Sequence, residues 1–357
     1  MVEVTQGDLR AAVAAGMVSE AQAASVQALA AQRLAGAPAR DDEAFELFRG
    51  FAEIFISVGL LILMSGIMGL AAMSGDALVL SIVGIVLSMG LARYFTLKRR
   101  MVLPSIVLVC GYALAVLVLL GWLVLSNMTT QTGLRGSLLT VFGGTLAALL
   151  LWYRIFRLPF TMLLIGLSGL MVMLAVAAPY ETMAFLGRQD FDVMFDLWQG
   201  SRLAFTTLVF GLAAAAAGLW FDMRDPHRLG RYSASAFWLH LLAAPAIVNT
   251  LAQTALGLVG AAQFVAMACV LVVMTIFALV IDRRSFLTAG LGYLAWLIWA
   301  LASRSGEGLD WPVVLILIGG AVTALGAWWV PLRARLMRVL PDFPGKDRLP
   351  PYAKGAL

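Results

Sequence analysis

Charged residues are scarce in this sequence. Of its 357 residues, 13% are Asp, Glu, Lys or Arg, and 62% are hydrophobic. The length alone would suggest about two soluble domains, but so apolar a composition excludes ordinary soluble domains. The alternation of apolar and polar residues that marks transmembrane strands is also absent. The sequence therefore predicts an all-α protein, a polytopic transmembrane helical bundle.

Residues that commonly bind metals or act as nucleophiles are also few. The two cysteines, Cys110 and Cys269, lie within apolar segments and lack the spacing of a zinc site or a disulfide framework. No glycine-rich nucleotide loop follows a strand, and no nucleophile is accompanied by a base. A lipid-handling membrane enzyme would need such a catalytic set. The sequence thus predicts no enzymatic activity, no cofactor and no metal.

No cleavable signal peptide is expected either, since the first fifty residues are polar or Ala-rich and contain no apolar core. The first apolar segment is therefore expected to direct insertion. A hydrocarbon core about 30 Å thick needs ~20 apolar residues per helix. Ten spans are predicted, of which the fourth and ninth are short: 51–73, 77–97, 102–125, 137–153, 158–178, 203–221, 233–253, 256–281, 286–302 and 311–330.

Basic residues gather on one side of this arrangement. With the N-terminus inside, the outer connections hold only four of the 25 basic residues, namely Arg135, Arg188, Arg202 and Arg304. Because short loops rich in Lys and Arg stay in the cytoplasm, both termini are predicted to be cytoplasmic. The net charge of +5 is thereby explained without a nucleic-acid partner. The excess of Arg over Lys and the abundance of Ala favour a bacterial inner membrane.

Residues 1–40 are predicted to form a cytoplasmic helical hairpin and its linker. Gly16 suits the end of a first helix, and Ser19 with Gln22 forms a capping box for a second. Two short helices cannot bury a stable core alone. Residues 5–35 are therefore expected to dock on their own bundle, on a second copy or on a protein partner. At the other end, residues 332–357 are predicted to be a basic, Pro-rich cytoplasmic tail after the bundle of residues 41–331.

Small residues recur at four-residue steps in the second span. Gly84, Ser88 and Ala92 would form a row along one face of a helix. Such rows let neighbouring helices approach closely. The pattern predicts a packed bundle in contact with the lipid bilayer.

The span at 233–253 is unusual because it contains His240, Pro245, Asn249 and Gln253. Asn249 and Gln253 are four residues apart and share a helix face, whereas His240 faces another side. Pro245 frees the carbonyl of the residue four positions before it. One interpretation is a broken helix whose polar groups line a path across the membrane. The other is that the amides hydrogen-bond to neighbouring helices and that the proline is simply tolerated.

The longest outer connection carries an amphipathic stretch at 190–199. On a helix, Asp192 and Asp196 would stack on one face and Trp198 would lie on the apolar face. The stretch is expected to lie on the outer leaflet. Its acids could simply be solvated, or they could bind a cation or a basic partner. The stretch could also form a lid over an outward-facing path.

Charged residues at span ends favour salt bridges over chemistry. Asp222, Asp225 and His227 lie close enough together to suggest a metal site, but Arg224 competes for the carboxylates and favours a salt-bridged turn. At the start of the first span, Glu53 favours an interfacial salt bridge over a proton relay.

Three segments resemble sequences of a bacterial membrane-protein family without an assigned activity. These are LRAAVAAGMVSEAQAASV at 9–26, DPHRLGRYSASAFWLHLLAAPAIV at 225–248 and DRRSFLTAGLGYL at 282–294. The resemblance covers a minor part of the chain. It implies an inner-membrane protein with an N-terminal helical hairpin and about ten spans, and it carries over no catalytic residues.

Two functions remain open from the sequence. Two groups of five spans would run in opposite directions, as in inverted-repeat transporters, although no motif recurs between them. The first hypothesis is a transporter-like bundle for a small or amphipathic solute, with His240, Pro245, Asn249 and Gln253 on its path. The second is a scaffold or sensor whose N-terminal hairpin recruits a partner.

Overall fold

The chain divides into two compact units, Met1–Ala44 and Phe45–Leu357, and each is considered by itself. The computed structural model describes 51–126, 133–178, 195–199, 201–225, 231–287, 290, 292, 311–343 and 345–350, with seven isolated positions before residue 27. The hairpin predicted for 5–35 lies almost entirely outside the described residues. The fold is therefore that of the second unit.

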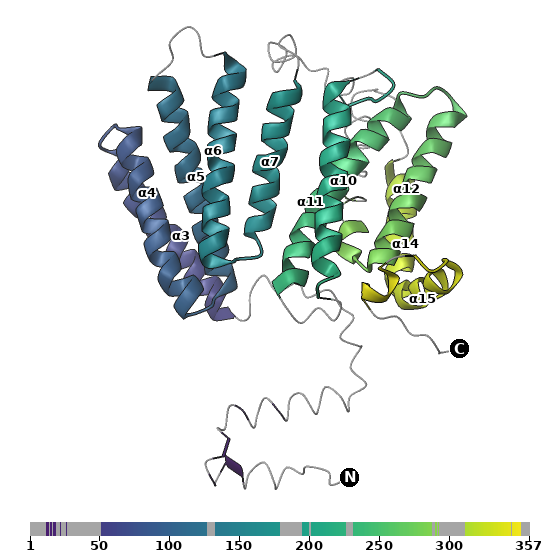
Figure 1. The fold of residues 1–357 in the computed structure, drawn as a ribbon, viewed down its shortest axis with the longest axis horizontal. Coiled ribbons are helices and arrows are strands. Elements are labelled where there is room, and N and C mark those ends of the chain that lie inside the picture. The colour runs from purple at the N-terminus through teal and green to yellow at the C-terminus, as the bar shows by residue number, and fades with distance from the viewer. Residues whose placement is uncertain are drawn as a thin grey trace. The chain divides into compact units, whose positions relative to one another are not determined.

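Helices make up the regular structure in the described part of the second unit (Figure 1). The first group comprises α3 (Phe51–Ala72), α4 (Ala77–Ala92), the π-helix η1 (Arg93–Lys98), α5 (Val102–Ser126), α6 (Leu134–Phe156) and α7 (Thr161–Ala177). The second comprises α10 (Arg202–Asp222), α11 (Arg231–Leu256), α12 (Ala261–Ile281), α14 (Trp311–Ala327), α15 (Trp329–Val339) and the short 3-10 helix η2 (Lys346–Arg348). The predicted all-helical class is confirmed for these residues.

Six of the described helices are long and apolar enough to cross a bilayer: Phe51–Ala72, Ala77–Lys98, Val102–Ser126, Leu134–Phe156, Arg202–Asp222 and Arg231–Leu256. Two further apolar helices, Thr161–Ala177 and Val265–Ile281, are shorter. A multi-pass membrane protein is thus confirmed in outline. The count of ten spans and the cytoplasmic termini stay predictions, and most of the ninth predicted span lies outside the described residues.

The fourth span is longer than its sequence suggested. It was predicted at 137–153, yet α6 has 23 residues and takes in Arg135 and Arg154 near its two ends. Gly133 precedes the helix in an extended conformation, and Arg157 ends it with a left-handed φ of 50°. Because polar residues are tolerated at helix ends, apolarity alone placed both limits three residues too far inward.

Two apolar clusters form the interior of the described part of the second unit. One lies among α3 to α7 around Leu108, Leu149 and Trp152, and the other lies among α10 to α15 around Ala244 and Phe286. Among the described helices, α10 and α11 share the most extensive contact, and both also contact α7. The polar residues near the ends of α10, α11 and α12 are therefore held by close packing.

The small residues of α4 face the interior as predicted. Gly84, Ser88 and Ala92 are all buried. A Cβ atom built on Gly84 would lie 2.8 Å from the Cβ of Ala115 on α5. The two backbones therefore approach too closely for any larger residue, so the row of small residues does set the α4–α5 packing.

The start of the predicted C-terminal tail is structured. α15 packs on α12 and lies across its end (Figure 1). Arg333 is buried and donates from Nε to the carbonyl of Leu279, 3.1 Å away, and from Nη2 to the carbonyl of Pro350, 2.6 Å away. This arginine therefore joins one of the last carbonyls of α12 to the carbonyl of Pro350.

Candidate functional site

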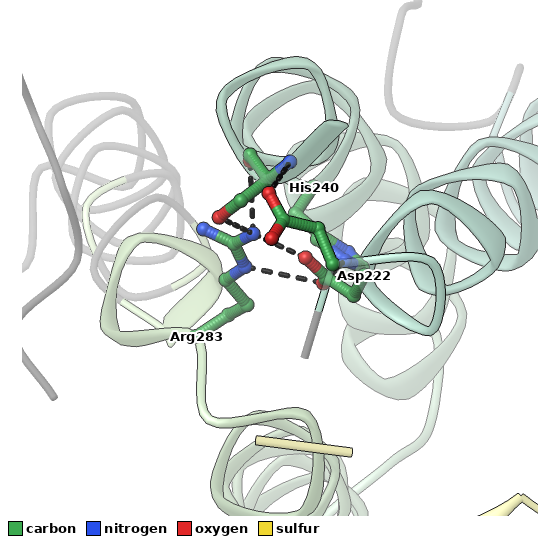
Figure 2. A network of polar contacts seen from close by, with 5 residues as sticks. Asp222, His240 and Arg283 are labelled. Carbon is green, nitrogen blue, oxygen red and sulfur yellow. Dashed lines mark hydrogen bonds and ion pairs between the residues drawn. The ribbon is translucent and has the colours of Figure 1, made fainter. Parts of the chain in front are cut away.

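A buried network of polar and charged side chains joins three helices of the second group. Asp222, His240 and Arg283 are 1%, 0% and 1% exposed. Asp222 is the last residue of α10, His240 lies within α11, and Arg283 follows the end of α12. Figure 2 shows the three side chains converging. Ionisable side chains this deeply buried among membrane helices are costly and are usually functional.

The local backbone explains how each side chain reaches the network. A Cβ on Gly218, one turn before Asp222, would lie within 2.8 to 3.1 Å of three ring atoms of His240, so only glycine leaves room for the imidazole. α12 ends at Ile281, and Asp282 then adopts a left-handed φ of 56°. Aspartate tolerates this conformation better than most residues. The reversal turns Arg283 toward α10 and α11.

Arg283 and Asp222 form a two-point ion pair. Nε of Arg283 donates to Oδ2 of Asp222 at 3.2 Å, and Nη2 donates to Oδ1. The same Nη2 also donates to Ser233 on α11, to its carbonyl at 2.9 Å and its hydroxyl at 3.1 Å. Such paired contacts are the strongest form of the arginine–carboxylate interaction. The pair is electrically neutral, and α11 is attached to it through Ser233.

His240 adds a proton-binding group to this neutral pair. Its Nε2 lies 2.9 Å from Oδ2 of Asp222. An ionised carboxylate only accepts, so Nε2 is the donor to Asp222, and in the neutral ring Nδ1 would then keep its lone pair. Nδ1 is buried and has no hydrogen-bond partner among the described residues. The Phe286 ring packs edge-on against the imidazole, with centroids 6.0 Å apart. The imidazole thus contacts a carboxylate through one ring nitrogen, while its other ring nitrogen has no hydrogen-bond partner among the described residues.

Comparisons with protein families, curated proteins and solved structures find nothing that matches this chain. Function is therefore argued from the geometry of the network. Within the described residues, no three His, Cys, Asp or Glu side chains are placed to hold a metal ion. The network itself offers an imidazole, a carboxylate and a guanidinium that hydrogen-bond to one another.

A second polar network lies next to the first in the chain. Trp329 of α15 donates from Nε1 to Oδ1 of Asp282 at 2.7 Å. Nε of Arg333 lies 3.5 Å from the same carboxylate oxygen. Asp282 thus fixes α15 to the end of α12, while its neighbour Arg283 fixes α10 and α11. The two networks thus meet at adjacent residues of the turn that follows α12.

The four residues predicted to line a path are divided by the structure. His240 belongs to the charged network, and its polar contact is to Asp222. Asn249 is nine residues away, about 13 Å along the helix axis at 1.5 Å per residue, and Gln253 is one turn further. α11 runs without interruption from Arg231 to Leu256 across Pro245. The broken helix is therefore wrong, since close packing of α11 keeps the helix together despite one missing hydrogen bond.

The predicted outer lid differs from its expected form where it is described. Residues 195–199 make turns, and Asp192 lies outside the described residues. Asp196 is 5% exposed and caps the backbone N–H of Trp198 at 2.8 Å, whereas Trp198 is 74% exposed. The next residue, Leu197, donates its N–H to the hydroxyl of Thr254 at 3.0 Å. The expected burial is reversed, because backbone hydrogen bonds fix this segment to α11 instead of an apolar helix face.

Two predicted groups of charged residues at span ends have partners in the structure that differ from those expected. Asp222 pairs with Arg283 and His240, and Asp225 accepts a hydrogen bond from the N–H of Ser233 at 3.4 Å. His227 lies outside the described residues. Glu53 makes no interfacial salt bridge in the described residues. Its Oε2 instead accepts from the N–H groups of Val102 and Leu103, 3.2 Å each, and caps α5.

Sequence reasoning missed Arg283 and placed Asp222 in a turn. Arg283 was assigned to the basic residues that orient the chain, a role that requires no specific contact. One signal was available, because a histidine within an apolar span needs a polar partner and charged residues near span ends are the candidates. The sequence does not say which of them is the partner.

Proposed function

We propose that this chain moves a small or amphipathic solute across a bacterial inner membrane, and that His240 binds and releases a proton during that movement. The supporting observation is the fully buried imidazole of His240, bonded through Nε2 to Asp222 and unpartnered at Nδ1 among the described residues. Histidine is the side chain whose charge ordinarily changes between pH 5 and 8. Buried carboxylate and histidine chains are typical of proton-coupled membrane proteins.

A purely structural role explains only part of the network. The Arg283–Asp222 pair is neutral and gains additional bonds from Ser233. It would connect α10, α11 and the end of α12 without a histidine. The unpartnered Nδ1 of His240 costs about 1–3 kcal/mol as a buried polar atom. A feature that lowers stability and binds protons favours a functional role.

Protonation would change the balance of charge at this point. With Nδ1 protonated, Asp222 faces the guanidinium of Arg283 and an imidazolium together. The network then carries a net positive charge in a buried setting, which is unfavourable. Release of Arg283 from Asp222 or separation of α10 from α11 restores the balance. Proton binding is thus linked to a change in how three helix ends meet.

The alternative scaffold or sensor function depends on residues 5–35, which lie almost entirely outside the described residues. It predicts that the buried network only maintains the fold. The two hypotheses therefore differ in what a change at His240 does to proton movement.

Proton entry into liposomes provides the test. The purified chain is reconstituted with pyranine inside the vesicles, and a potassium diffusion potential drives protons inward. We expect the wild type to acidify the liposomes faster than empty liposomes acidify. We expect liposomes with His240→Gln to acidify at the rate of empty liposomes. Glutamine keeps an N–H for Asp222, so the ion pair is preserved. His227→Gln, at the chain's other histidine, is the matched control and should behave as the wild type. Equal rates for the wild type and His240→Gln would contradict the proposal.

A further inference from the structure

A cavity with a volume of about 530 Å³ lies where the end of α7 meets the start of α10. Its apolar lining includes Val176, Leu197 and Phe205, and its polar lining includes Arg202 and Thr206. The upper ends of α7 and α10 lie side by side in Figure 1, and the two helices are in contact. Sites for small ligands commonly measure 300–1,000 Å³, so the cavity has the size of a ligand site.

Arg202 brings a positive charge to this cavity without a protein partner in the described part of the chain. No hydrogen bond or ion pair joins its guanidinium to any described residue. Arg135, at the start of α6, contrasts with it, because Arg135 donates to the carbonyl of Ala178. Among the described residues, one of the two arginines near the end of α7 is therefore bonded to the fold, and the other lines the cavity without such a bond.

The lining defines the chemistry of that ligand. A guanidinium binds a carboxylate or a phosphate through two parallel hydrogen bonds. The side chains of Val176, Leu197 and Phe205 are apolar and would favour a hydrocarbon chain over a polar one. Phe205 is 63% exposed, so an elongated ligand could extend beyond the cavity. A small polar anion would leave these walls uncovered.

We propose that this cavity binds an amphipathic anion, with one carboxylate or phosphate group on Arg202 and an alkyl chain against Val176, Leu197 and Phe205. The anion is either a free fatty acid or the head group of an anionic membrane lipid. The inference names the solute class of the proposed function, and in that respect it rests on that function. Binding itself does not require transport.

Binding of a dansyl-labelled undecanoic acid measures the interaction. The full chain is placed in phosphatidylcholine nanodiscs, and the probe is titrated by fluorescence. We expect saturable binding by the wild type and a dissociation constant about tenfold or more higher for Arg202→Gln, from the loss of a charge-assisted hydrogen bond. Arg202→Lys should retain part of the affinity. Arg335→Gln, at an exposed arginine on α15, makes the same change of charge elsewhere and should bind as the wild type.

A second variant tests the walls independently of the charge. Val176→Trp fills the cavity and should abolish saturable binding. Replacing part of the phosphatidylcholine with phosphatidylglycerol separates the two sources of the anion. If phosphatidylglycerol weakens probe binding to the wild type but not to Arg202→Gln, the site binds lipid head groups. If phosphatidylglycerol does not weaken probe binding to the wild type, the site binds free fatty acids. Equal affinity in Arg202→Gln and the wild type, or binding that does not saturate, would overturn the proposal.

The outcome is independent of the proton experiment. His240→Gln should bind the probe with wild-type affinity, because His240 does not line the cavity. If Arg202→Gln binds normally while His240→Gln still abolishes proton entry, the cavity assignment fails and the proton-linked function stands. If Arg202→Gln weakens probe binding while His240→Gln leaves proton entry unchanged, the lipid-binding site stands and the proton-linked function fails.

Discussion

In the region α3 to α7, the described buried side chains are mainly apolar or hydroxyl-bearing, and aromatic packing is prominent. Trp152 lies between Tyr112 and Phe156, with ring centroids 4.6 and 4.4 Å away. In the region α10 to α15, buried charges join elements far apart in the sequence. Asp222 and Arg283 are 61 residues apart, and Trp329 reaches Asp282 across 47 residues.

The first region is held mainly by apolar packing, whereas the second contains the buried charged groups. The first region has a single buried carboxylate among its described residues, Glu53, and backbone amides satisfy it. A change of pH or of one side chain there would leave the charge balance nearly intact. In the second region, the buried contacts of Asp222, His240 and Arg283 join three helices, and the proposed protonation of His240 would act on all three. We therefore expect conformational change in α10 to α15 and a comparatively fixed framework in α3 to α7.

The largest effect is expected from breaking the ion pair of the second region. Arg283→Met leaves the Asp222 charge buried without its cation and should cost about 3–5 kcal/mol of the free energy of unfolding. Unfolding in detergent micelles, followed by fluorescence, measures the loss. The double variant Asp222→Asn with Arg283→Met removes both charges and should recover much of that stability. A double variant no more stable than Arg283→Met would mean that the buried charge is not the cause.

The second network should show a somewhat smaller effect, of about 1.5–3 kcal/mol for a hydrogen bond to a charged acceptor. Trp329→Phe removes the Nε1–H that Asp282 accepts at 2.7 Å and keeps most of the aromatic contact. The adjacent Trp328 is 61% exposed, whereas Trp329 is 3% exposed. Trp328→Phe is therefore a matched control that should leave the melting temperature unchanged. Similar losses in both variants would show that α15 is held by general packing.

Space around the imidazole provides the next test. Gly218→Ala places a methyl group within 3.1 Å of the His240 ring and should cost about 1–3 kcal/mol by overpacking. Gly90→Ala, on α4 in the first region, meets no atom within 4 Å and should be neutral or stabilising, because alanine favours helix. Thermal unfolding of the two variants measures the contrast. If Gly218→Ala is as stable as Gly90→Ala, the ring is not confined as described.

The helical class and six of the apolar helices followed from the sequence, since water-free surroundings require backbone groups to bond within each helix. The row of Gly84, Ser88 and Ala92 likewise predicted close packing, because its four-residue spacing fixes one face. These features depend on the pattern of neighbouring residues in the sequence. Each can be obtained from composition and periodicity alone.

The candidate site depends on contacts that the pattern of neighbouring residues does not determine. His240 was recognised as unusual, but its partners Asp222 and Arg283 lie 18 and 43 residues away along the chain, at the ends of two other helices. A left-handed Asp282 and the absent Cβ of Gly218 bring them together. Asp196 was expected in solvent for the same reason, because its burial depends on the distant end of α11. Sequence patterns indicate that a polar group needs a partner, and tertiary packing chooses it.

The smallest effect is expected at Glu53, the buried carboxylate of the first region. Its Oε2 accepts from two N–H groups at the start of α5, and the amide oxygen of Glu53→Gln can accept the same bonds. Only the favourable interaction of a negative charge with the helix N-terminus is lost, about 0.3–1 kcal/mol. Glu53→Ala also removes the acceptor and should cost about 0.5–2 kcal/mol, as other helix caps do. Chemical unfolding of both variants alongside Arg283→Met compares the two regions directly. A loss for Glu53→Gln as large as that for Arg283→Met would mean that buried charge matters equally in both, and the division between framework and responsive region would not hold.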